Sequence, residues 1–167
     1  MDKITIERIK EAHPNVREML MAQYLEANNL LGKGVRLRFA YVYRSPELQR
    51  KLFNSVPKIT NADAWQSIHN YGLAFDIVLL IDKNGDGIFE EATYDTLKDF
   101  DGDKIADWME VTNYFKSKGW EWGGDWKKFK DKPHFQMDFG FDWKVLKQRI
   151  ERNIVIKDVN GITYPKI

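Results

Sequence analysis

The sequence predicts an α+β domain in which helices flank a small antiparallel sheet. Three observations support this fold class. The chain has 167 residues, which is enough for one domain with a hydrophobic core and leaves little room for a second. Segments with helical spacing are interspersed with segments of strand-like alternation. No internal repeat and no low-complexity linker divides the chain, so we expect residues 1–167 to form a single domain.

Five segments have the apolar spacing or the end signals of helices. Ser45 and Pro46 mark the start of one, because serine caps a helix N-terminus and proline suits the first turn. Gly119 marks the end of another. The five predicted helices cover residues 4–12, 15–31, 46–54, 108–119 and 142–152.

Three segments are expected to be strands. Residues 35–43 alternate in the manner of a half-buried strand, and residues 73–82 are apolar enough to lie at the centre of a sheet. Residues 133–140 supply a third strand. The C-terminal residues 153–167 are expected to form a small hairpin or an edge strand.

Composition excludes several classes of function. A net charge of +1 gives no electrostatic basis for binding nucleic acid or an anionic membrane surface. No stretch approaches the roughly 20 apolar residues of a membrane span, so we expect no membrane insertion. We also expect the protein to be a monomer. The absence of cysteine excludes disulfides, thiolate zinc sites and cysteine nucleophiles. The N-terminal residues lack the apolar stretch of a secretory signal, so synthesis in the cytoplasm is expected.

Two of the three histidines stand in specific surroundings. Catalytic zinc typically takes two histidines and one carboxylate, and His69, Asp76 and His134 supply that set. Residues seven apart in an unbroken strand point to opposite faces, but Gly72 allows a turn after which Asp76 can point back to His69. Asp131, three residues before His134, would serve a metal hydrolase as its general base. The alternative is a structural histidine before a strand, with Asp76 as a cap or a salt-bridge partner.

Three ordered motifs carry a family resemblance. Every fixed position of the pattern S-x-H-x-x-G-x-A-x-D, the signature of the zinc DD-peptidase superfamily, is matched by Ser67, His69, Gly72, Ala74 and Asp76. A downstream block, GWEWGGDWKKFKDKPHFQ, is similar to the W-G-G-D-W…D-x-P-H-F block of the L-alanyl-D-glutamate endopeptidases. Upstream, YRSPELQRKLF is similar to the family's R-S…Q…L-[FY] element. The chain resembles this family over about residues 35–145, which implies a hedgehog/DD-peptidase-like version of the α+β fold.

The resemblance implies roles for individual residues. His69, Asp76 and His134 would bind Zn²⁺, and Asp131 would be the catalytic base. Arg44 would face the substrate, either polarising the scissile carbonyl or pairing with a substrate carboxylate. A surface salt bridge is the alternative for Arg44.

Three further residues are candidates for contact with the substrate. Ser67 would hydrogen-bond the substrate or orient a ligand, with capping of a turn as the alternative. Gln49 follows the start of its helix by one turn and would contact the substrate, with support of the site from behind or a solvated side chain as the alternatives. Trp126 belongs to a block of three tryptophans, of which we expect one or two in the core and the rest along a groove for a muropeptide.

The implied activity is zinc-dependent hydrolysis of the peptidoglycan stem peptide at the bond between L-Ala and D-Glu. This branch of the family contains bacteriophage endolysins and bacterial cell-wall hydrolases. A chain without a signal peptide fits a cell-wall-lysing endolysin released by a holin, and a bacterial enzyme exported by another route is the alternative. Two other functions stay open: a D-Ala-D-Ala carboxypeptidase or dipeptidase, and a non-catalytic wall-binding module.

An acidic insertion at about residues 82–110 resembles two calcium loops. Its second half has oxygen ligands at positions 1, 3, 5, 9 and 12 of an EF-hand loop and a carbonyl at position 7: Asp99, Asp101, Asp103, Asp107, Glu110 and Ile105. Its first half supplies Asp82, Asn84 and Asp86, but lacks the closing glutamate. We expect Ca²⁺ to bind at the second loop and to order the insertion. That calcium also switches activity is a further hypothesis. The alternative is a solvated acidic loop, and Lys104 at the usual glycine position weakens the match.

Overall fold

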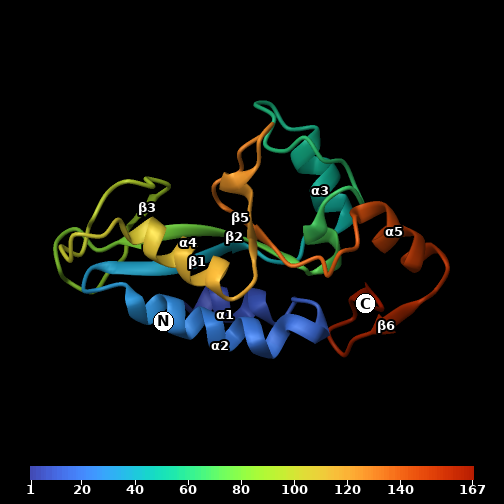
Figure 1. Cartoon of the computed structure of the whole chain (residues 1–167), viewed down its shortest axis with the longest axis horizontal. Coiled ribbons are helices and arrows are strands. Elements are labelled where there is room, and N and C mark those ends of the chain that lie inside the picture. The colour runs from blue at the N-terminus through green and yellow to red at the C-terminus, as the bar shows by residue number, and fades with distance from the viewer.

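The computed structural model describes residues 1–167 as seven strands, five α-helices and two short 3-10 helices (Figure 1). None of these helices combines the length and the apolar character needed to cross a membrane. In chain order the elements are α1 (Lys3–Ile9), α2 (Pro14–Leu30), β1 (Val35–Tyr41), α3 (Pro46–Phe53), η1 (Ile68–Tyr71), β2 (Ala74–Ile81), β3 (Glu91–Thr93), α4 (Asp107–Ser117), β4 (Glu121–Trp122), η2 (Gly123–Asp125), β5 (His134–Gln136), α5 (Trp143–Glu151), β6 (Val155–Lys157) and β7 (Thr163–Pro165).

The predicted α+β class is confirmed, and every predicted helix and strand is present with ends that differ by a few residues. The largest difference is the strand expected over 133–140, because β5 keeps only three paired residues before the chain turns back at Asp138. The C-terminal hairpin is the pair β6 and β7. The two strands that the sequence did not predict, β3 and β4, have three and two residues, which is too short for an alternating pattern.

Strand β2 is the centre of a five-stranded antiparallel sheet. β1 pairs along one edge of β2, while β5 pairs with Ala74–Asp76 and β3 with Leu79–Ile81 along the other edge. Successive side chains of a strand point to opposite faces. Phe75 and Ile77 are fully buried on the face that packs against the helices, so Asp76 between them points to the opposite face.

A stack of phenylalanines fixes the register of the strands on the helix-covered face. Phe75 of β2 stacks between Phe39 of β1 and Phe135 of β5, with ring centroids 4.3 and 5.2 Å away. Phe115 of α4 packs edge-on against Phe75 at 4.7 Å. Full burial of one such side chain contributes about 1.5–3 kcal/mol. The stack therefore holds β2 and β5 side by side, which positions the polar residues that these strands carry on the other face.

The C-terminal hairpin is attached to the N-terminal helices through His13. The imidazole is fully buried, accepts a hydrogen bond at Nδ1 from Asn15 N at the start of α2, and donates from Nε2 to the carbonyl of Pro165 at 2.8 Å. Tyr164 packs edge-on against the ring at 5.4 Å. This bonding pattern requires the neutral imidazole, because a protonated Nδ1 could not accept a hydrogen bond.

The burial of His13 predicts an acid-dependent loss of stability. Burial, with the nearby charge of Arg17, lowers the pKa of His13 below the ordinary value of 6.5. The unfolded chain therefore binds the proton more readily than the folded one. The contribution to stability is fully present above pH 6.5 and is lost as the pH falls below that value through the lowered pKa, by about 1.4 kcal/mol for each unit of difference.

Chemical denaturation of the wild type and His13→Asn between pH 8 and pH 5, at matched metal content, measures this contribution. Asparagine keeps a capping acceptor but cannot be protonated near neutrality. We expect the free energy of unfolding of the variant to fall less steeply with acidification. Parallel curves for the two proteins would show that His13 does not titrate between the two states.

Candidate metal centre and active-site cleft

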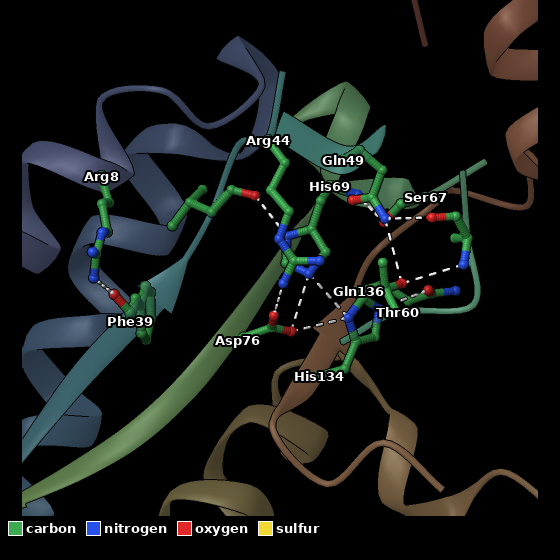
Figure 2. Close-up of polar contacts among 12 residues, drawn as sticks. Arg8, Phe39, Arg44, Gln49, Thr60, Ser67, His69, Asp76, His134 and Gln136 are labelled. Carbon is green, nitrogen blue, oxygen red and sulfur yellow. Dashed lines mark hydrogen bonds and ion pairs between the residues drawn. The ribbon is translucent and has the colours of Figure 1, made fainter. Parts of the chain in front are cut away.

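Three polar side chains converge on the open face of the sheet (Figure 2). His69 lies in η1, Asp76 in β2 and His134 in β5, and Asp76 and His134 are directly paired residues of the two strands. Gly72 ends η1 in the left-handed conformation at φ +68°, and the reversal brings His69 back over the start of β2. The turn predicted at Gly72 is therefore present, and it explains how residues seven apart meet.

The distances among the three ligand atoms match the geometry of a small cation site. His69 Nε2 lies 3.0 Å from Asp76 Oδ1 and 3.1 Å from His134 Nδ1, and the last two atoms are 3.2 Å apart. Ligands about 2.0–2.1 Å from a tetrahedral ion are about 3.3–3.4 Å from one another. The residues present therefore fit a zinc-sized ion with only a slight expansion of the triangle.

Hydrogen bonds behind the ligands select the imidazole tautomers. His69 Nδ1 donates to the carbonyl of Val42 at 2.7 Å, which leaves the Nε2 lone pair facing Asp76. His134 Nε2 donates to Gln136 Oε1 at 3.0 Å, which leaves the Nδ1 lone pair facing the same point. Such partners behind a ligating histidine raise its basicity and fix its ring. Two lone pairs and a carboxylate aimed at one point favour a cation between them.

Buried charge also shapes the protonation of the site. Burial, together with the positive charge of Arg44, lowers the pKa of His69 to about 4, so this imidazole is neutral at physiological pH. Burial alone would raise the pKa of Asp76, but His69 and Arg44 hold it well below its usual range. The pKa of His134 is raised despite burial, because the Asp76 carboxylate stabilises the protonated ring, in which Nδ1 also carries a hydrogen. Asp76 is therefore a permanent anion.

Arg44 is bound to the same carboxylate rather than to the outer surface. Its guanidinium donates to Asp76 Oδ2 and lies over the ring of Tyr41, with Cζ 4.3 Å from the ring centroid. The residue is 8% exposed, lines the cleft, and its buried Nε has no partner. The ion pair of Arg44 is therefore buried, unlike the surface salt bridge considered from the sequence, and the residue lines the cleft.

Asp131 stands beside the three ligands at the junction of two cavities. Burial and the charge of Asp76 raise the pKa of its carboxyl above the ordinary value. Its backbone is fixed by Gly123, whose carbonyl accepts from Asp131 N at 3.0 Å. A Cβ on Gly123 would lie 2.4 Å from the Asp131 carbonyl oxygen, so only glycine allows this approach. Gly123 thus allows η2 to lie directly against the loop that carries Asp131.

A cavity of about 330 Å³ opens beside the metal-site residues and contains most of the predicted contact residues. Ser67 lines it, but its hydroxyl also accepts a hydrogen bond from His69 N and caps η1. Trp126 lines it with its ring 5.2 Å from that of His134, whereas Trp120 of the same block is 3% exposed and belongs to the core.

Gln49 is placed differently from the predicted substrate contact. Its side chain is fully buried and outside the cavity wall. The amide donates to Ala62 O at 2.8 Å and Thr60 Oγ1 at 3.3 Å, both on the loop that forms the wall. The prediction of direct contact is corrected to the alternative of support from behind, because helix α3 turns Gln49 inward.

Gln136, which supports the metal site from behind, was not predicted from the sequence. It lies two residues after His134 on the same face of β5, and its side chain holds the imidazole. The sequence did hold a signal for this role: Gln136 is polar and lies two positions after His134 in a predicted strand, so both side chains point to the same face.

The acidic insertion forms two loops with the same hydrogen-bond pattern. Asp82 accepts from the N–H groups of Gly85 and Gly87, and Asp99 accepts from those of Gly102 and Lys104. Lys104 adopts φ +79°, so the turn that normally requires glycine forms with lysine. The objection raised by Lys104 from the sequence is thus removed.

The carboxylates of the insertion gather in three groups within 4.8 Å: Asp82, Asp86 and Glu90; Asp99, Asp101 and Asp103; and Asp101, Asp107 and Glu110. Asn84 bonds to Asp86 in the first loop, and the side chain of Ile105 is half-exposed, as a residue contributing only its carbonyl would be. In the second loop Asp107 is fully buried and its Oδ1 has no partner.

Replacement of Gln136 predicts weaker metal binding. Gln136→Leu removes the acceptor behind His134, so we expect the affinity for Zn²⁺ to fall by about tenfold or more. Gln136→Glu keeps an acceptor at this position and should retain the affinity. Competition with a chromophoric chelator measures both dissociation constants, and equal values for wild type and Gln136→Leu would contradict the role of this residue.

Comparisons with known proteins agree with this geometry. Residues 60–137, which contain all three ligands and Asp131, match the M15 peptidase family described as D-alanyl-D-alanine carboxypeptidase. The chain is 35% identical over 134 residues to the peptidoglycan L-alanyl-D-glutamate endopeptidase CwlK of Bacillus subtilis (strain 168), covering 76% of this chain and 74% of that protein. The fold is similar to that of the L-Ala D-Glu endopeptidase ChiX of Serratia marcescens, with a TM-score of 0.54 and 23% identity over 83% of this chain and 90% of that one. The chain therefore belongs to the M15 family of peptidases.

Proposed function

We propose that this protein is a zinc-dependent endopeptidase that hydrolyses the peptidoglycan stem peptide between L-Ala and D-Glu. The observation that carries the proposal is the triangle of His69, Asp76 and His134 with Asp131 beside it in an open cleft. The similarity to a peptidoglycan L-alanyl-D-glutamate endopeptidase over three quarters of the chain supports the choice of bond. Cell-wall lysis, as by an endolysin, is the biological role that fits this activity, with residues 1–167 acting as one catalytic unit.

Each residue of the cleft has a part in this reaction. Zn²⁺ held by the three ligands would supply Lewis acidity, which acidifies water and polarises the scissile carbonyl. Asp131 accepts the proton of the attacking water and returns it to the leaving amine. Arg44, which lines the cleft, donates to the oxygen on which negative charge develops or to a substrate carboxylate.

A carboxypeptidase acting on D-Ala-D-Ala is the competing activity, because the matching family carries that description. The cleft supports the endopeptidase. Two adjoining open cavities share Asp131 in their walls, which gives the substrate more room beside the base than one terminal residue needs. A carboxypeptidase needs room for only one terminal residue on the leaving side.

Loss of the base tests the function directly. We expect Asp131→Asn to lower kcat by about 10²–10⁴-fold while Zn²⁺ stays bound, because Asp131 is not one of the three ligands. The measurement is mass spectrometry of muropeptides after digestion of purified cell walls, with metal content determined on the same samples. Asp125→Asn is the matched control, since Asp125 belongs to the same segment but pairs with Lys116 away from the cleft.

Products that have lost only a terminal D-Ala would reject the endopeptidase in favour of the carboxypeptidase. Equal wall lysis by the wild type and Asp131→Asn would reject the enzyme and favour a wall-binding module.

We also propose that the second loop of the acidic insertion binds Ca²⁺. Burial and the charge of Asp101 raise the pKa of Asp107 to about 6, and burial with the surrounding carboxylates raises that of Glu110 to about 7. The buried Oδ1 of Asp107 has no partner, although an unpaired buried oxygen costs about 1–3 kcal/mol. Asp101 reaches back to Gly32 N at 2.6 Å, so a cation here would tie the insertion to the turn before β1.

Calcium is predicted to stabilise the protein through this loop. Ca²⁺ at about 100 times its dissociation constant should raise Tm by about 5–10 °C. Asp107→Asn should abolish most of this increase, whereas Asp95→Asn, an exposed site in the same insertion, should keep it. Thermal unfolding in Ca²⁺ and in EGTA at fixed zinc measures the shift. An unchanged shift in Asp107→Asn would remove the second loop as the site.

A further inference from the structure

A second cavity, of about 210 Å³, adjoins the one described above and shares Asp131 in its wall, and we call it the Tyr94 cavity. Its wall includes Tyr41, Ile59 and Tyr94, and it shares Arg44, Thr60, Phe129 and Asp131 with the first cavity. Tyr41, Ile59 and Tyr94 were not predicted as site residues. Because the cavity adjoins the catalytic base, whatever occupies it lies next to the scissile bond.

The position of Tyr94 follows from the pairing of β3. Thr93, the last residue of β3, lies opposite Leu79 of β2, and the strands are antiparallel. The next residue, Tyr94, therefore continues toward the end of β2 that carries Asp76. The pKa of Tyr94 is raised by burial and by the charge of Asp76, which is consistent with this proximity. The short strand β3 thus delivers a residue of the acidic insertion to the catalytic cleft.

Tyr94 is supported from behind and free in front. Its ring packs against Trp108 of α4, with centroids 6.1 Å apart, and Trp108 is fully buried. Tyr94 itself is 57% exposed and lines the cavity. A bulge in β1, where Ala40 is the extra residue between the pairs of Phe39 and Tyr41, turns Tyr41 to the same cavity. The result is a fixed apolar wall with two phenol groups.

The two cavities differ in where they carry free carboxylates. Away from the residues that both share, the first cavity contains Gln136 and the carboxylates of Asp138 and Asp142. The Tyr94 cavity has Tyr41, Ile59 and Tyr94 there, and its one carboxylate, Asp76, is paired with Arg44. A stem peptide has the same asymmetry about the L-Ala–D-Glu bond. The D-Glu side carries carboxylates and, at the third residue, an amine. The L-Ala side carries the alanine methyl group and the N-acetylmuramoyl sugar with its lactyl and acetyl methyl groups.

We propose that the Tyr94 cavity binds the N-acetylmuramoyl–L-alanyl side of the substrate, with Tyr94 in contact with the sugar. This inference rests on the proposed function, since it assigns the two sides of the same scissile bond. The amine of the third residue then lies toward Asp138 and Asp142, and the D-Glu carboxylate lies near Arg44 at the junction. Tyr94 is a specificity-determining residue, because its contact is made only when the sugar is present.

Two substrates separate this role from a general effect on the site. One is a muropeptide with N-acetylmuramic acid on L-Ala-D-Glu-diamino acid, and the other is the same peptide with an N-acetyl group in place of the sugar. We expect wild type to cut both at the L-Ala–D-Glu bond, with a lower KM for the muropeptide. Tyr94→Ala should raise the KM for the muropeptide by about tenfold and leave kcat/KM for the sugar-free peptide within about twofold.

Controls guard against an effect on folding. Leu97→Ala alters a residue that is 86% exposed in the same insertion and lies outside both cavities, so both substrates should be cut as by wild type. Ile59→Ala alters another wall residue of the Tyr94 cavity, which is 63% exposed. Like Tyr94→Ala, this variant should reduce the preference for the muropeptide.

The outcomes distinguish the inference from the function beneath it. An equal loss on both substrates in Tyr94→Ala, or no loss on either, overturns the assignment of the cavity while the endopeptidase stands. The assignment of the cavity is also overturned if the wild type does not prefer the muropeptide over the sugar-free peptide. Failure of the wild type to cut either substrate at the L-Ala–D-Glu bond contradicts the proposed function and the inference together.

Discussion

An electrostatic constraint at one point of the sheet organises this molecule. Two imidazole lone pairs and a carboxylate oxygen lie within 3.0–3.2 Å of one another, and their hydrogen bonds turn them toward a common centre. Without a positive charge between them these atoms repel, so the arrangement requires either protons or a metal ion. The surrounding structure is built to maintain it: Val42 O and Gln136 hold the rings, Arg44 balances the carboxylate, and Gly72 and Gly123 allow the necessary close approaches of the backbone.

Strand β2 links this constraint to the rest of the fold. Its helix-facing residues form the phenylalanine stack that sets the register with β1 and β5, and the same register places Asp76 opposite His134. Farther along, β2 pairs with β3 and so positions the acidic insertion, which contributes Tyr94 to the cleft. The stability of the core and the geometry of the cleft therefore depend on the same backbone pairing. A slip by one residue would move Asp76 to the buried face.

Much of this arrangement was predictable from the sequence. Periodicity and capping residues located the helices and the long strands, and the spacing around Gly72 together with the family motifs located the three ligands, Asp131 and Arg44. Residues whose role depends on tertiary contact were not predictable. Gln49 faces inward because of the packing of α3, Gln136 matters only through the ring of His134, and Tyr94 reaches the cleft through a three-residue strand with no pattern of its own. Lys104 adopts the left-handed conformation, which lysine rarely takes, because the hydrogen bonds of the loop hold its backbone there.

The central claim, that the triangle of ligand atoms holds one zinc ion, is tested most directly by X-ray absorption spectroscopy at the zinc edge on protein loaded with one equivalent of Zn²⁺. The account predicts stoichiometric binding with nitrogen and oxygen ligands at about 2.0–2.1 Å and the outer-shell scattering of two imidazoles. Scattering from two imidazoles should become scattering from one in His134→Ala. A zinc signal with no imidazole contribution, or no stoichiometric binding, would contradict the account.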